Sequence, residues 1–138
     1  MVKLIFIILL NISSIQLFSQ NNSNGKLSDT ELREQDSIFR IFMFDLNSMN
    51  FDKARLSLSP KTSQMITDVR MNQLKDQFSG KDSLIMFMSG LGISQDGTRL
   101  TILQYKYITD TNSVPLYLLK VELNDKSKIV YLQPLQRN

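Results

Sequence analysis

The stretch LIMFMSGLGI (Leu84–Ile93), with the triplet Gln95-Asp96-Gly97 just after it, decides how this chain folds. The stretch is apolar with Gly90 and Gly92 inside it, which predicts a strand that bends or bulges at its glycines. The triplet is a hairpin turn signal, because aspartate followed by glycine suits the backbone angles of a tight turn. A β-hairpin is therefore expected to begin at Leu84.

Three further strands are predicted after this turn. They cover residues 98–109, 114–123 and 128–135, and the turn-rich segments Asp110-Thr111-Asn112-Ser113 and Asn124-Asp125-Lys126-Ser127 separate them. Residues of the strand at 114–123 alternate so that one face carries Tyr117, Leu119, Val121 and Leu123. Each connection is too short for a crossover helix, so the four strands should form an antiparallel meander.

The half of the chain before Leu84 has the periodicity of helices. Ser28 and Glu31 form a capping box that begins a first helix, which runs to about Leu46. Apolar residues recur along this helix at helical spacing, at Ile38, Phe39, Phe42 and Leu46. A second, short helix is expected over residues 51–58. It should stop at Ser59-Pro60, because the residue before a proline avoids helical geometry.

A third helix is expected from about Thr62 to Phe78, with Gly80 placed to terminate it. Its apolar side would consist of Met65, Ile66, Val69, Leu74 and Phe78. Helices followed by strands with short turns make an α+β pattern. The predicted fold is three N-terminal helices packed on a curved four-stranded antiparallel meander sheet, whose inner face closes over the first helix.

Residues 1–19 predict export. Lys3 gives a positive start, residues 4–10 are an unbroken apolar run, and cleavage between Ser19 and Gln20 would leave a small residue at the exit. Retention as a membrane anchor is the alternative, but the run is far shorter than the roughly 20 residues that span a bilayer. We therefore predict a signal peptide (1–19), a disordered lead-in (20–27) and one domain (28–138). The mature domain would be periplasmic or extracellular, with no stable membrane insertion.

Composition excludes several kinds of chemistry. The chain has neither cysteine nor histidine, so disulfides, the usual zinc sites and nucleophile–histidine relays are excluded. The formal net charge of +3 is spread along the chain, without the basic cluster that nucleic-acid binding requires. Any catalysis would have to use carboxylates, tyrosines or lysines. We expect no metal, no cofactor and no nucleic-acid partner.

Four short segments carry a resemblance to a known superfamily: Phe44-Asp45-Leu46, Asn50-Phe51-Asp52-Lys53-Ala54, residues 74–80, and Leu119-Lys120-Val121-Glu122-Leu123 with Lys128-Ile129. With the order of elements, they make the chain similar to the nuclear-transport-factor-two-like superfamily, also called the cystatin-like cone, and to its small secreted bacterial domains. The resemblance implies a cone-shaped cavity between the sheet and the helices. Members include ketosteroid-isomerase-like enzymes, dehydratases, ligand binders and interaction modules, so a shared fold says little about activity.

Five aromatic residues are the candidate ligand-binding residues: Phe39, Phe42, Tyr105, Tyr107 and Tyr117. They would line the cavity, and Tyr105 and Tyr107 share one face of their strand and could offer phenolic donors. The alternative is that the tyrosines are ordinary strand aromatics, which pack at the sheet edge or mediate a dimer.

An isomerase-type mechanism needs a carboxylate base as well as a hydrogen-bond donor. Asp45 and Asp110 are the candidates for that role, but Asp45 lies near a helix end and Asp110 in a turn, where we expect solvent to reach both. We therefore assign no catalytic residue.

The leading hypothesis is an exported non-enzymatic domain that binds a small apolar ligand or a protein partner, such as another envelope protein. A cavity enzyme of isomerase or dehydratase type, using a carboxylate and a tyrosine, is the first alternative. A structural component of an envelope assembly is the second, and it would dock or form a homodimer through the sheet face. The enzyme needs an acidic side chain within reach of a tyrosine, the binder a sizeable apolar cavity, and the assembly component an exposed apolar sheet patch.

Overall fold

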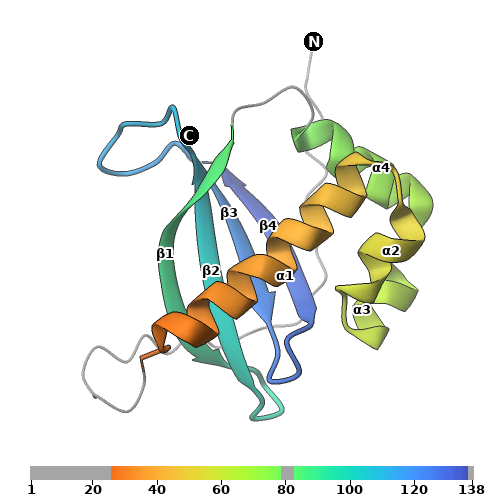
Figure 1. Cartoon of the computed structure of the whole chain (residues 1–138), viewed down its shortest axis with the longest axis horizontal. Coiled ribbons are helices and arrows are strands. Elements are labelled where there is room, and N and C mark those ends of the chain that lie inside the picture. The colour runs from red at the N-terminus through yellow and green to blue at the C-terminus, as the bar shows by residue number, and fades with distance from the viewer. Residues whose placement is uncertain (1–25, 79–82, 137–138) are drawn as a thin grey trace.

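A computed structural model describes residues 26–78 and 83–136 of the chain, and within them four helices precede four strands (Figure 1). The helices are α1 (Asp29–Asn47), α2 (Phe51–Leu56), α3 (Pro60–Met65) and α4 (Asp68–Phe78). The strands are β1 (Leu84–Ile93), β2 (Arg99–Tyr107), β3 (Tyr117–Leu123) and β4 (Ile129–Gln136). The expected signal peptide (1–19), most of the expected lead-in (20–27) and the expected helix end at Gly80 lie outside the described residues.

The strands form one sheet in the order β1-β2-β3-β4, and each neighbouring pair is antiparallel. This confirms the predicted α+β class and the antiparallel meander. In Figure 1, α1 lies across one face of the sheet, α2 and α4 pack against α1 toward its C-terminal end, and α3 contacts β4. The two faces of the sheet are therefore in different environments.

Helix α1 begins as the sequence predicts. The Ser28 hydroxyl oxygen accepts a hydrogen bond from the Glu31 backbone N–H at 3.2 Å, and the Ser28 N–H donates to Glu31 Oε2 at 2.8 Å. The bond from the Ser28 N–H and, after it, one from the Ser28 hydroxyl to the same carboxylate oxygen at 2.9 Å lower the pKa of the Glu31 carboxyl. The capping box therefore holds one end of the helix that crosses the sheet.

The prediction of three helices is wrong in number, because the stretch expected as the third helix is split into α3 and α4. Ser59 caps α3 by accepting a hydrogen bond from the Thr62 N–H at 3.2 Å, and Pro60 occupies the first helical position, where its missing N–H costs nothing. Ile66 then has an extended backbone, which ends α3. The interruption changes which side of α4 packs inward, so Val69 is exposed and Met71 is buried.

Strand β1 has the predicted bounds, but its irregularity lies elsewhere. The register shifts between Met86 and Met88, whereas the two glycines keep regular pairs with β2. Gly92 is needed for space instead, because a Cβ there would lie 2.9 Å from the Ile102 side chain. The predicted turn is confirmed at Gly97, which has a φ of +85°.

The core lies between α1 and the inner face of the sheet, and α2 and α4 close its end. Helix α1 contributes Phe39, Phe42 and Leu46, which follow the helical spacing of its sequence. Helix α2 packs against α1 and buries Ala54 completely. The sheet contributes mainly Leu103, Tyr105, Leu119, Val121, Leu123 and Ile129.

Candidate functional site

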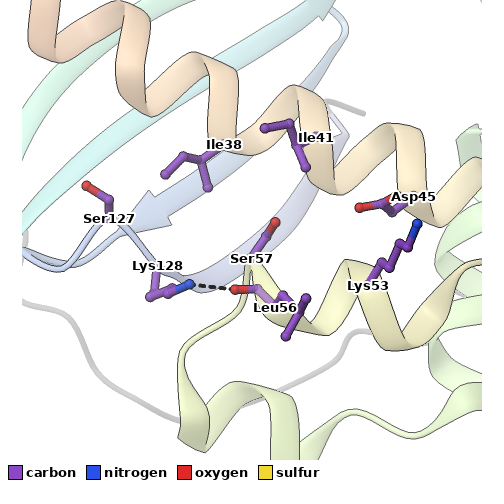
Figure 2. Close-up of a pocket in the computed structure, with 8 residues that line it drawn as sticks. All are labelled: Ile38, Ile41, Asp45, Lys53, Leu56, Ser57, Ser127 and Lys128. Carbon is purple, nitrogen blue, oxygen red and sulfur yellow. Dashed lines mark hydrogen bonds between the residues drawn. The ribbon is translucent and has the colours of Figure 1, made fainter.

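A pocket of about 310 Å³ opens where α1, α2 and the β3–β4 turn meet (Figure 2). Its lining residues come from three separate parts of the chain: Ile38, Ile41, Asp45, Lys53, Leu56, Ser57, Ser127 and Lys128. Its wall is apolar at Ile38, Ile41 and Leu56. Asp45 of α1 adds a carboxylate, and Lys53 and Lys128 bring positive charge to the side opposite α1. The arrangement suits an apolar group that carries or neighbours a negative charge.

Hydrogen bonds between the end of α2 and the sheet hold this pocket in shape. Lys128 Nζ donates to the Leu56 carbonyl at 2.6 Å, and the Ile129 N–H donates to the Ser57 carbonyl at 2.9 Å. The next residue, Leu58, forms a parallel bridge with Ile129. The chain leaving α2 is thus bonded to the start of β4, and the pocket wall does not depend on side-chain packing alone.

Exposed apolar side chains surround the pocket. Ile41 and Leu56 line it and are 53% and 70% exposed, and Phe44, one helical turn beyond Ile41, is 70% exposed. We call these three residues the α1–α2 apolar surface. Single exposed apolar residues are common on protein surfaces, but a group of three on neighbouring helices is not. Such groups mark interaction sites.

The expectation that solvent reaches Asp45 is wrong, because Asp45 lies in this pocket and is buried near the end of α1. Lys53 of α2 lines the same pocket (Figure 2). Asp110, the other carboxylate, accepts hydrogen bonds from the Leu116 and Asn112 N–H groups. A hydrogen bond from the Asn112 side chain is the main cause of the lowered pKa of the Asp110 carboxyl. Asp110 therefore organises the β2–β3 loop.

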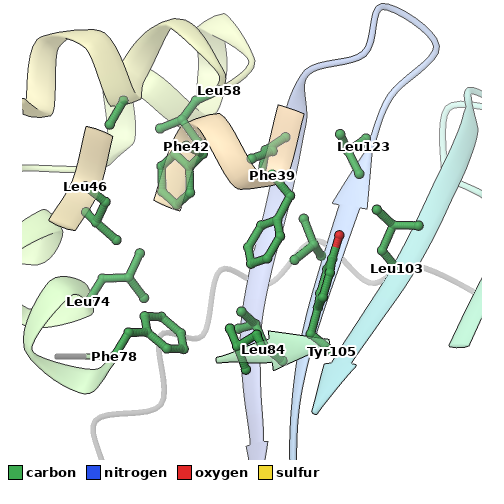
Figure 3. Close-up of a cluster of buried hydrophobic side chains, with 14 of the residues drawn as sticks. Phe39, Phe42, Leu46, Leu58, Leu74, Phe78, Leu84, Leu103, Tyr105 and Leu123 are labelled. Atoms are coloured by element: carbon green, nitrogen blue, oxygen red, sulfur yellow. The ribbon is translucent and has the colours of Figure 1, made fainter. Parts of the chain in front are cut away.

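The structure places the five predicted ligand-binding residues away from this pocket. Phe39, Phe42 and Tyr105 are buried in the core, where the rings of Phe39 and Tyr105 stack with centroids 4.2 Å apart (Figure 3). Tyr107 and Tyr117 are half-buried and stack on each other at 5.0 Å. None of the five lines the pocket described above. Their role in binding stays a prediction.

One carboxylate does reach a tyrosine. The Tyr105 hydroxyl donates to Asp36 Oδ1 at 2.8 Å, and Arg40 Nε lies 3.3 Å from the same oxygen. Arg40 also donates to the Leu84 carbonyl at 2.8 Å. Sequence patterns do not predict that Asp36 pairs with Tyr105. They show only that Asp36 and Arg40, four residues apart, lie on one face of the helix.

The surroundings of Tyr105 make it a hydrogen-bond donor. Burial, first, and then the hydrogen bond to Asp36 and its charge raise the pKa of the Tyr105 phenol far above its usual value. The phenol therefore keeps its proton, and the group connects β2 to α1. This arrangement closes the fold and leaves Tyr105 unsuited to act as a base.

Alkaline pH should destabilise the chain through its tyrosines. Burial raises the pKa of both Tyr105 and Tyr117 in the folded state, so the unfolded chain loses these protons first once pH exceeds about 10. We expect the free energy of unfolding to hold up to that pH and to fall above it. Urea unfolding between pH ~8 and ~11 measures this. Tyr105→Phe should give a shallower fall, and an equally steep one would contradict the assignment.

Comparisons with protein-family models, with curated proteins and with solved structures found no match. Within residues 26–78 and 83–136, no helix has the length and apolar character needed to cross a membrane. The same residues contain no group of three or more acidic side chains placed to hold a metal ion.

Proposed function

We propose that this chain is an exported, non-enzymatic domain that binds a segment of a protein partner in the pocket between α1 and α2. The observation that carries the proposal is the exposure of Ile41 and Leu56 at the pocket, continued along α1 by Phe44. Burying these side chains against a partner would remove apolar surface from water, which is the main driving force of association.

The size of the pocket favours a protein segment over a larger small molecule. A volume of about 310 Å³ is at the small end of ligand pockets, and it suits a single apolar side chain. Phe44 lies outside the pocket and would add contact area, as aromatic residues do at the centre of interfaces. Two lysines, Lys53 and Lys128, and a single carboxylate, Asp45, line the pocket, and this positive excess favours a partner with an acidic residue beside its apolar anchor.

The proposal also includes export of the chain and a cone-shaped fold. Export rests on residues 1–19, and the cone-shaped fold of the nuclear-transport-factor-two-like superfamily rests on sequence resemblance. A small apolar ligand remains the alternative occupant. A structural role in an envelope assembly, through the sheet face, remains an alternative function.

The hydrogen bond between Tyr105 and Asp36 supports a second candidate, the isomerase or dehydratase type of enzyme, because it pairs a tyrosine with a carboxylate. Three features of the pair weigh against this candidate. Tyr105 is completely buried, its pKa is raised, and Arg40 pairs with Asp36. We therefore place the enzyme second.

A photo-crosslinking amino acid at Leu56 tests the proposed function. Leu56 and Val69 have nearly equal exposure, 70% and 67%, but only Leu56 lines the pocket, so Val69 is the matched control. In cells that produce the chain, irradiation should give a discrete protein-sized adduct from position 56 and none from position 69. A small added mass at position 56 would instead identify a small ligand. Equal adducts at both positions, or none at 56, would contradict the proposal.

A further inference from the structure

The two edges of the sheet are protected to different degrees. At the β4 edge, the Ser59 N–H donates to the Ile129 carbonyl at 2.8 Å, and the Thr62 hydroxyl donates to the Val130 carbonyl at 3.1 Å. Farther along β4, Pro134 has no N–H to offer to another strand. Ser59, Thr62 of α3 and a proline thus protect the β4 edge against pairing with other chains.

The β1 edge has little such protection. Its ten residues contain no charged side chain and no proline, and Phe87, Met88 and Ile93 are exposed. At the start of the strand, Arg40 donates a hydrogen bond to the Leu84 carbonyl. The register shift between Met86 and Met88 then interrupts the regular pairing with β2. The segment Met88–Ile93 remains regular, apolar and uncharged at the edge of the sheet.

The hydrogen-bonding pattern shows which backbone groups face outward. The Ser94 N–H donates to the Thr98 carbonyl at 2.9 Å, so Ser94 directs its backbone groups toward β2. Backbone direction alternates along an antiparallel edge strand. Counting back through the regular pairs of Met88–Ile93, the backbone groups of Ser89, Leu91 and Ile93 point away from β2. These groups are placed to bond another strand.

We propose that β1 pairs in antiparallel fashion with β1 of a second copy of this chain, over Met88–Ile93 and centred on Leu91. Only an extended strand matches donors and acceptors that repeat at every second residue. A copy of the same strand fits because a two-fold axis sets β1 against itself, and an uncharged strand meets no like charge there. Among the described residues, no atom beyond its chain neighbours lies within 4 Å of a Cβ built at Gly90, so the face of the strand next to Leu91 is also uncovered.

This dimer is independent of the proposed partner site, because none of the residues lining the α1–α2 pocket belongs to β1. It also differs from a dimer formed through the sheet face, since it joins the two sheets side by side into one continuous sheet. Its contacts come from backbone groups more than from side chains. That difference makes it testable by a substitution that removes a single N–H.

Ser89→Pro is the decisive variant, with Ser89→Ala as its matched control. Proline removes the Ser89 N–H, which points to the open edge and serves no bond to β2, whereas alanine keeps it. In sedimentation equilibrium of the purified chain, we expect wild type and Ser89→Ala to dimerise. Ser89→Pro should weaken dimerisation by about tenfold or more. A monomeric wild type, or a Ser89→Pro dimer of unchanged affinity, would overturn the proposal.

A second variant covers the case in which proline disturbs the fold itself. Ser89 is exposed, so lysine there should leave the far-UV circular dichroism spectrum and the melting temperature unchanged. In the proposed dimer each lysine lies two residues from the axis and directly opposite Ile93 of the second copy. A charged side chain on an edge strand opposes pairing, so Ser89→Lys should weaken dimerisation by about tenfold or more. The Leu91 amide should exchange with solvent slowly in wild type and rapidly in this variant. A Ser89→Lys dimer with wild-type affinity, or open-ended growth of wild-type assemblies, would overturn the proposal.

Discussion

Phe39→Ala is expected to lower the free energy of unfolding by about 3–5 kcal/mol, because the Phe39 ring is completely buried and leaves a cavity when it is removed. The ring lies in the middle of α1 and stacks on Tyr105 of β2, so it joins the helical layer to the sheet. The change should also weaken the nearby hydrogen bond from Tyr105 to Asp36. Equilibrium unfolding in urea measures the loss, which is a large fraction of the stability of a small domain.

Phe44→Ala is the matched control for this prediction. The two phenylalanines belong to the same helix and lose the same atoms, but Phe44 is 70% exposed. Its replacement should change the free energy of unfolding by less than about 0.5 kcal/mol. The same replacement should reduce the photo-crosslinked adduct at position 56, because Phe44 belongs to the α1–α2 apolar surface. Similar losses of stability in both variants would show that α1 does not face the sheet through Phe39.

The sheet could be predicted from the sequence because its signals are local. Each strand is an apolar or alternating run bounded by a short turn, and turns that short permit only antiparallel neighbours. The Ser28–Glu31 capping box is also local, and it placed the start of α1 correctly. Strand bounds differ from the predicted ones mainly at the ends, where Tyr117 rather than Val114 begins β3.

The sequence did not predict that a separate helix, α3, begins at Pro60, because the pair Ser59-Pro60 can either end one helix or begin another. A residue before proline avoids helical geometry, so Ser59-Pro60 was interpreted only as the end of a helix. The same extended serine is also a good N-cap, with the proline at the first helical position. Both meanings apply here, since α2 ends before Ser59 and α3 begins at Pro60.

The candidate site could not be predicted because it depends on residues far apart in the chain. The Tyr105 hydroxyl meets Asp36 across 69 positions of sequence, and only the docking of α1 on β2 brings them together. The pocket likewise needs Ile41, Leu56 and Lys128 from three elements. Sequence patterns show that Phe39 and Tyr105 are aromatic and inward-facing, but they do not show whether the space between them is filled.

Glu122→Leu is expected to lower the free energy of unfolding by about 3–5 kcal/mol, since it leaves a buried ammonium group without its partner. Lys120 Nζ lies 2.7 Å from Glu122 Oε1, and both side chains are buried on the sheet face opposite α1. Tyr131 of β4 borders the pair, with its ring centroid 5.9 Å from Lys120 Nζ. Burial and, after it, the charge of Glu122 raise the pKa of Tyr131.

The double variant Lys120→Met/Glu122→Leu should recover most or all of that loss. Removing both charges removes the cost of keeping them out of water, and such replacements are often neutral or stabilising. The Lys75–Asp76 pair, whose aspartate side chain is 65% exposed, is the control, and Asp76→Ala should cost less than about 1 kcal/mol. Urea unfolding of the single and double variants measures the coupling between Lys120 and Glu122. If Glu122→Leu costs no more than Asp76→Ala, water reaches this face of the sheet and its charges are solvated. If instead the double variant stays as unstable as Glu122→Leu, the loss comes from packing around position 122.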